Sequence, residues 1–87
     1  MPKVEVYSSV FCPSCDKAKQ LLTRKGVAFE EIEVSNNVEK AREMTERSNG
    51  RRSVPQIFVD GECIGGFQAL HLLESRGELD AKLGIEK

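Results

Sequence analysis

Two cysteines, Cys12 and Cys15, are the side chains of this 87-residue chain best suited to do chemistry. A C-x-x-C pair can close a disulfide within one helical turn, so one thiol can attack a substrate disulfide and the other can resolve the mixed disulfide. The pair falls where an alternating strand pattern at 3–7 ends and a helical pattern at 13–25 begins. The sequence therefore predicts a redox-active dithiol at a strand–helix junction.

The start of the predicted helix favours a thiolate at Cys12. The first helical turn leaves backbone N–H groups unpaired and carries partial positive charge, which lowers the pKa of a thiol placed there. Pro13 suits the first helical position because its fixed φ is helical. We therefore expect Cys12 to be the nucleophile and the more buried Cys15 to be the resolving thiol. Lys17 is a further candidate for stabilising the thiolate.

A C-x-x-C pair can also form half of a zinc site, which needs four ligands when it is structural. Cys63 and the sole histidine, His71, would complete such a set. Cys63 lacks a second ligand at short spacing, His71 lies in an apolar helical stretch, and Pro13 between the cysteines favours redox work. Redox chemistry is therefore the preferred hypothesis and zinc binding the alternative.

The composition and charge of the chain argue against several other classes of protein. Thirteen basic and fourteen acidic residues give a net charge of −1, which argues against a basic nucleic-acid-binding surface. No apolar run approaches the ~20 residues of a membrane span. Met1–Lys3 leads directly into the first strand pattern, and three cysteines are an odd number, so we expect neither a signal peptide nor a secreted disulfide scaffold. The expectation is one domain over 1–87, cytoplasmic and monomeric.

The hydrophobic patterns predict alternating strands and helices. Asn36 with Glu39 predicts a capping box, and Asp60-Gly61 predicts a tight hairpin turn. Leu70, Leu72 and Leu73 are expected to face the core, and Val38, Ala41 and Met44 form a thinner apolar stripe. The predicted strands are 3–7, 27–34 (starting near 30), 56–59 and 62–65, and the predicted helices are 13–25, 38–48, 67–75 and a short final turn at 78–83.

Three motifs, taken in order, resemble the glutaredoxin branch of the thioredoxin superfamily: Cys12-Pro13-Ser14-Cys15, Ser53-Val54-Pro55 and Gly65-Gly66. The resemblance extends from about residue 3 to residue 83. It implies an α/β, thioredoxin-like fold of order β-α-β-α-β-β-α, with a four-stranded mixed sheet flanked by three main helices and the first strand in the centre. It also implies glutathione as co-substrate, no tightly bound cofactor, and disulfide-bonded or glutathionylated proteins as partners.

The resemblance assigns binding roles to two further segments. Pro55 is expected to follow a cis peptide bond, so that the backbone of Val54 faces the cysteines and pairs with an incoming thiol peptide. The N–H groups that open the helix after Gly65-Gly66 are expected to hold the γ-glutamyl carboxylate of glutathione. The implied glutathione-binding residues are Arg51, Ser53, Val54, Pro55, Gly66, Phe67 and Gln68.

The sequence departs from the family pattern at three places. Ser9 stands where many members carry a lysine, so Arg51 or Arg52 would have to replace it. Ser14 replaces the usual aromatic residue, and Gln68 lies where an aspartate is common. These changes leave two alternatives open. The protein could be a redoxin reduced by a thioredoxin reductase, or it could bridge a [2Fe-2S] cluster between two monomers through Cys12 and glutathione, which Pro13 disfavours.

Overall fold

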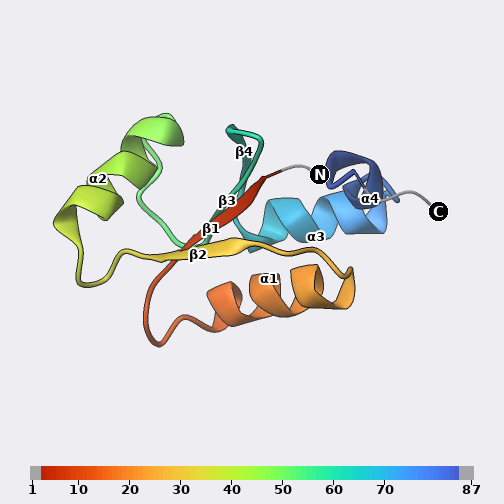
Figure 1. The fold of residues 1–87 in the computed structure, drawn as a ribbon, viewed down its shortest axis with the longest axis horizontal. Coiled ribbons are helices and arrows are strands. Elements are labelled where there is room, and N and C mark those ends of the chain that lie inside the picture. Colours follow the sequence, from red (N-terminus) through yellow and green to blue (C-terminus); the bar gives the residue numbers. More distant parts are fainter. Residues whose placement is uncertain (1–2, 85–87) are drawn as a thin grey trace.

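The computed structural model describes residues 3–84, so the expectation concerning Met1 and Pro2 lies outside the described residues. A four-stranded mixed sheet of order β2-β1-β3-β4 forms the middle layer (Figure 1). β1 runs parallel to β2 and antiparallel to β3, and β3 runs antiparallel to β4. The predicted fold is confirmed, with β1 in the interior of the sheet. The elements are β1 Val4–Ser8, α1 Pro13–Arg24, β2 Glu30–Glu33, α2 Val38–Arg47, β3 Gln56–Val59, β4 Glu62–Gly65, α3 Phe67–Ser75 and α4 Leu79–Lys82.

One face of the sheet is covered by α1, α3 and α4 (Figure 1). Val4 and Val6 of β1 point to this side because alternate residues of a strand share a face. From the helix side, α1 contributes Ala18, Leu21 and Leu22, which are fully or almost fully buried. The buried cluster on this face comprises Val4, Val6, Ala18, Leu21, Leu22, Ile57, Val59, Leu70, Leu79 and Leu83.

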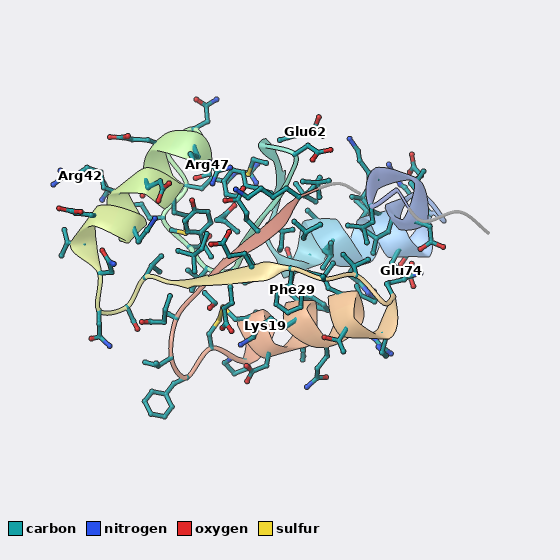
Figure 2. The ribbon with its side chains drawn as sticks, in the orientation of Figure 1. Lys19, Phe29, Arg42, Arg47, Glu62 and Glu74 are labelled. Carbon is teal, nitrogen blue, oxygen red and sulfur yellow. A yellow bond between two sulfur atoms is a disulfide. The ribbon has the colours of Figure 1, made fainter. Side chains whose placement is uncertain are left out.

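The opposite face carries α2 alone (Figure 1). Among residues 3–84, its buried apolar cluster consists of Tyr7, Met44 and Phe58, with Ile32, Val34, Val54 and Cys63 packed against it. Arg47 of α2 points toward the sheet, whereas Arg42 projects away from it (Figure 2). Within residues 3–84, no helix is long and apolar enough to cross a membrane.

Most predicted boundaries agree with the structure to within a residue or two. The hairpin turn at Asp60-Gly61 has the positive φ angles, 50° and 84°, that its sequence favours. The second strand is limited to Glu30–Glu33, in agreement with the predicted start near residue 30.

Two predictions about the helices are wrong. The N-cap of α2 is Asn37, whose side chain accepts a hydrogen bond from the backbone N–H of Lys40 at 3.0 Å, and not Asn36. Leu72 is 51% exposed, whereas Leu70 is buried and Leu73 packs against the core. Neighbouring residues of a helix point about 100° apart, so a nine-residue helix lying on the sheet cannot turn all three leucines inward.

Candidate active site

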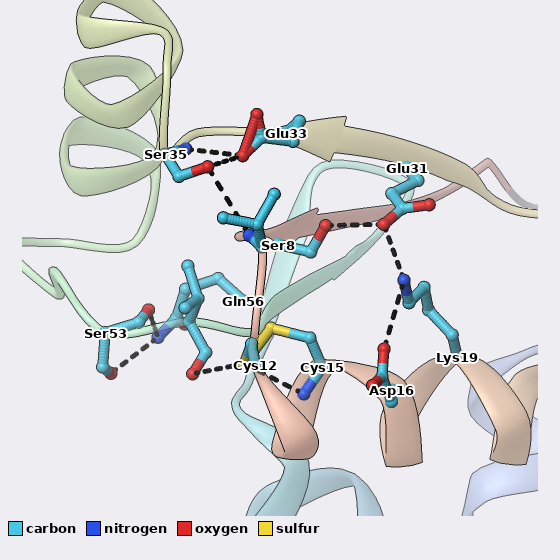
Figure 3. Close-up of a disulfide and its surroundings, with 12 residues drawn as sticks. Ser8, Cys12, Cys15, Asp16, Lys19, Glu31, Glu33, Ser35, Ser53 and Gln56 are labelled. Carbon is cyan, nitrogen blue, oxygen red and sulfur yellow. Dashed lines mark hydrogen bonds and ion pairs between the residues drawn. A yellow bond between two sulfur atoms is a disulfide. The ribbon is translucent and has the colours of Figure 1, made fainter.

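The β1–α1 loop places Cys12 at the N-cap of α1, with extended backbone angles, and Pro13 at the first helical position. Cys12 and Cys15 form a disulfide with Cα atoms 5.2 Å apart (Figure 3). The backbone N–H of Cys15 donates to Cys12 Sγ at 3.1 Å. Cys15 is fully buried, while Cys12 is partly accessible. Cys12 is therefore the sulfur that a substrate can reach.

A polar network ties the start of α1 to β2 (Figure 3). Ser8 Oγ and Lys19 Nζ both donate to Glu31 Oε2, at 2.8 and 2.7 Å. Lys19 Nζ also lies 3.6 Å from Asp16 Oδ1. The hydrogen bonds from Lys19 and Ser8 lower the pKa of Glu31, and the hydrogen bond to Glu31 raises the pKa of Lys19. Both side chains therefore stay charged near neutral pH. Their ion pair holds α1, the helix that carries the cysteines, close to β2.

The loop before β3 approaches the disulfide from the other side. The Val54–Pro55 peptide bond is cis, as the resemblance implied. The carbonyl oxygen of Val54 lies 4.0 Å from Cys12 Sγ. This is a contact in the disulfide, because the sulfur has no proton to donate. Gln56 is buried and donates to the carbonyl and hydroxyl oxygens of Ser53, at 2.9 and 3.3 Å, which fixes the loop.

A groove of about 780 Å³ runs from this loop to the start of α3. It contains every residue that the resemblance implied for ligand binding. Its lining is Ser14, Lys17, Arg51, Ser53, Val54, Pro55, Gln56, Gly66, Phe67, Gln68 and Ala69.

Gly65 and Gly66 allow close approaches that shape the groove. A Cβ on Gly65 would lie 2.8 Å from Arg51 Nη1 and 3.1 Å from the Cβ of Ala69, and the φ of Gly65 is +116°. A Cβ on Gly66 would lie 3.3 Å from the carbonyl oxygen of Pro55. The two glycines therefore let the Arg51 side chain and the Pro55 backbone pack against the start of α3.

Four groove residues were missed as binding candidates: Ser14, Lys17, Gln56 and Ala69. Lys17 is one turn after Ser14 on α1, so i, i+3 spacing could have placed both on the same wall. Gln56 could not have been found from its type, because a strand glutamine is ordinarily read as solvent-facing. Two residues considered in the sequence lie elsewhere, since Arg52 and Ser9 line a separate pocket.

The candidate zinc ligands are spread over the molecule. Cys63 lies on β4, packs against the cluster under α2, and has its Sγ 3.6 Å from Gln56 Oε1. His71 stacks on Phe67 with ring centroids 5.8 Å apart. Within residues 3–84, no group of three or more His, Cys, Asp or Glu side chains is arranged to hold a metal ion.

The fold and the disulfide at a helix start, with Cys12 partly accessible, define a thiol–disulfide oxidoreductase of the thioredoxin-like class. The glutaredoxin family model matches residues 4–64, and the chain belongs to the glutaredoxin family. It is 48% identical to glutaredoxin 3 of Escherichia coli K12 over 83 residues, which cover 95% of this chain and 99% of that protein. A Pseudomonas aeruginosa glutaredoxin is 46% identical, with coverage of 95% and 98%.

Solved structures agree with this assignment. The solution structure of a Brucella melitensis glutaredoxin matches with a TM-score of 0.83 at 44% identity, covering 95% of this chain and 89% of that one. A buckwheat glutaredoxin, solved as a complex with glutathione, shares the fold with a TM-score of 0.85 at 24% identity, covering 95% and 77%. The chain is a glutaredoxin-type thiol–disulfide oxidoreductase.

Proposed function

We propose that this protein is a glutathione-dependent oxidoreductase that reduces protein disulfides and glutathione mixed disulfides through Cys12 and Cys15. The observation that carries the proposal is the groove of about 780 Å³ beside the disulfide, because its lining unites Arg51 and Ser53–Pro55 with Gly66–Gln68. These segments are far apart in the sequence. A tripeptide thiol that lies in the groove would present its sulfur to Cys12 beside Val54.

Cys12 acts as the nucleophile in this proposal. The N–H of Cys15 and the positive end of α1 favour its thiolate after reduction. The thiolate attacks one substrate sulfur, and the other sulfur leaves as a thiolate that takes up a proton. Cys15 then attacks Cys12 Sγ, which releases the second substrate thiol and closes the Cys12–Cys15 disulfide. Two glutathione molecules reduce that disulfide and become glutathione disulfide.

The groove offers complementary groups to the ends of glutathione. Gly66 is the N-cap of α3, no described side chain caps this helix, and its first turn contains no acidic residue. The N–H groups of Phe67 and Gln68 therefore suit the γ-glutamyl carboxylate. Arg51 and Lys17 supply positive charge to the same groove, and neither takes part in an ion pair with the described residues 3–84. Arg51 is thus the cation that takes over the role of the lysine replaced by Ser9.

The experiment is coupled turnover of a small mixed disulfide with glutathione, glutathione reductase and NADPH. A parallel assay replaces both glutathione components with thioredoxin reductase. We expect turnover with glutathione, which Cys12→Ser abolishes and Cys15→Ser preserves for glutathione mixed disulfides only. Turnover solely with thioredoxin reductase would mean that Ser9 and Gln68 mark a different electron donor, and the glutathione site would be rejected.

A further inference from the structure

We propose that a second pocket, on the far side of Val54 from the groove, binds an acidic and apolar stretch beside the reactive cysteine of a protein disulfide substrate. The proposal rests on the function above only in taking Cys12 as the attacking thiol. We call this region the basic pocket. It has a volume of about 460 Å³ and is lined by Ser9, Val34, Val38, Ala41, Arg42, Met44, Thr45, Arg52 and Val54.

The basic pocket shares Val54, the residue that contacts Cys12, with the groove. Val54 lines both the groove and the basic pocket, and its carbonyl oxygen lies 4.0 Å from Cys12 Sγ. The consecutive residues Arg51 and Arg52 are divided between the two, one on each side of Val54. A tripeptide can be held in the groove alone. A protein segment that pairs with Val54 continues beyond the groove at about 3.3 Å per residue, so one flank reaches the basic pocket within a few residues of its cysteine.

The charge of the basic pocket determines which charge the substrate residues beside the reactive cysteine should carry. Its lining contains two arginines and no carboxylate. Within residues 3–84, no ion pair involves Arg42 or Arg52, although the neighbouring cations of α2 are occupied: Lys40 pairs with Glu43 and Arg47 with Glu5. Arg42 projects from α2 away from the sheet (Figure 2). Two unpaired guanidinium groups favour an aspartate or glutamate, which they can bind through paired hydrogen bonds.

The exposed apolar side chains around the basic pocket favour an apolar residue in the same substrate segment. Val38 in the wall is 76% exposed, and Val10 and Phe11, which connect Ser9 to Cys12, are 53% and 100% exposed. The N–H of Val10 lies 3.5 Å from Ser35 Oγ, so the loop is held near the start of α2. Exposed apolar side chains near an active site are typical of an interaction surface. The occupant is therefore an extended segment with an acidic residue and an apolar residue close to its cysteine.

The test measures single-turnover reduction of peptide disulfides by pre-reduced protein, without glutathione. Two peptides, each closed by its own disulfide, differ only in whether the residues that flank the reactive cysteine are acidic or basic. At low ionic strength we expect the second-order rate constant of reduction to be about tenfold higher for the acidic peptide. Arg42→Glu should remove or reverse this preference, and Arg42→Glu/Arg52→Glu should reverse it further. Reduction of the uncharged 2-hydroxyethyl disulfide should stay within about twofold in both variants.

Arg24→Glu is the matched control, because it makes the same charge change on α1, outside both the groove and the basic pocket. It should leave the acidic preference intact. Equal rates for the two peptides with the wild-type protein would overturn the proposal. It would also be overturned if Arg24→Glu weakened the acidic preference as much as Arg42→Glu does. The same holds if Arg42→Glu slowed the reduction of 2-hydroxyethyl disulfide as much as that of the acidic peptide. Since the assay contains no glutathione, its result is independent of the coupled assay that tests the glutathione site.

Discussion

On one face of the sheet, α1, α3 and α4 bury a continuous apolar cluster, whereas on the other face α2 packs on Tyr7 and Phe58 through its own Met44. On the second face, where the apolar cluster is small, a charged side chain of α2 also packs on the sheet. Arg47 donates to Glu5 Oε1 and Oε2 at 2.9 and 3.2 Å and to the Tyr7 hydroxyl at 2.6 Å. Its guanidinium lies 4.3 Å from the ring centroid of Phe58, within range of a cation–π contact.

The two faces of the sheet have different roles around the disulfide. Cys15 belongs to the helix that packs on the large apolar cluster, so the dithiol is anchored where close packing resists displacement. The basic pocket lies against α2, where Arg42 and Val38 are left exposed to solvent. The apolar face thus positions the reacting sulfurs, and the polar face leaves room for recognition.

The largest expected effect is on the apolar face. Leu22 is fully buried in the cluster, so Leu22→Ala removes three carbon atoms and leaves a cavity. We expect the free energy of unfolding to fall by about 3 kcal/mol, measured by urea denaturation. The matched control is Leu72→Ala on α3, which should change stability by less than about 0.5 kcal/mol because this side chain is half exposed. Similar losses for both variants would contradict the assignment of the core face.

On the α2 face, Arg47→Met keeps an unbranched side chain over Phe58 but leaves Glu5 and the Tyr7 hydroxyl without their donor. We expect a loss of about 2 kcal/mol in the free energy of unfolding, as for other hydrogen bonds to charged groups. Removing both partners of a partly buried ion pair is less damaging than removing one, so Glu5→Leu/Arg47→Met should recover much of this loss. Losses that simply add in the double variant would contradict coupling between the two residues.

The same pair predicts a pH dependence. The hydrogen bond from Arg47 lowers the pKa of Glu5 below its ordinary value of 4.5. The unfolded chain therefore binds a proton at a higher pH than the folded one, and the stability that Glu5 contributes is complete above pH 4.5 and lost as pH falls through its folded pKa. In urea titrations, Glu5→Gln should be less stable at pH 7 and should lose less stability on acidification. Part of the acid slope should remain, because the pKa of Glu31 is also lowered. An unchanged slope in Glu5→Gln would contradict the prediction.

Local signals explain which parts of this structure were predictable from the sequence. The Cys12 N-cap, the Pro13 start of α1 and the Asp60-Gly61 turn each depend on a few adjacent residues, and the structure contains all three. Most residues of the groove also follow from the resemblance to the family, although their order in the chain does not show that they share one groove.

Long-range and orientational features were not predictable. A charged helix residue such as Arg47 is ordinarily read as solvated, and only the register of β1 with β3 shows that Glu5 and Phe58 lie opposite one another beneath it. The division of Arg51 and Arg52 between two pockets depends on the path of one loop. No periodicity in the sequence indicates which of these two arginines lines which pocket.

The smallest expected effect concerns the start of α2, where two adjacent asparagines compete for one role. The structure makes Asn37 the N-cap, with its side chain accepting from the N–H of Lys40. Asn37→Ala should therefore lower the free energy of unfolding by about 1 kcal/mol, whereas Asn36→Ala should change it by less than about 0.5 kcal/mol. Urea denaturation of both variants measures the difference. The reverse order would restore the capping box of Asn36 and Glu39 and would start α2 one residue earlier, at Asn37.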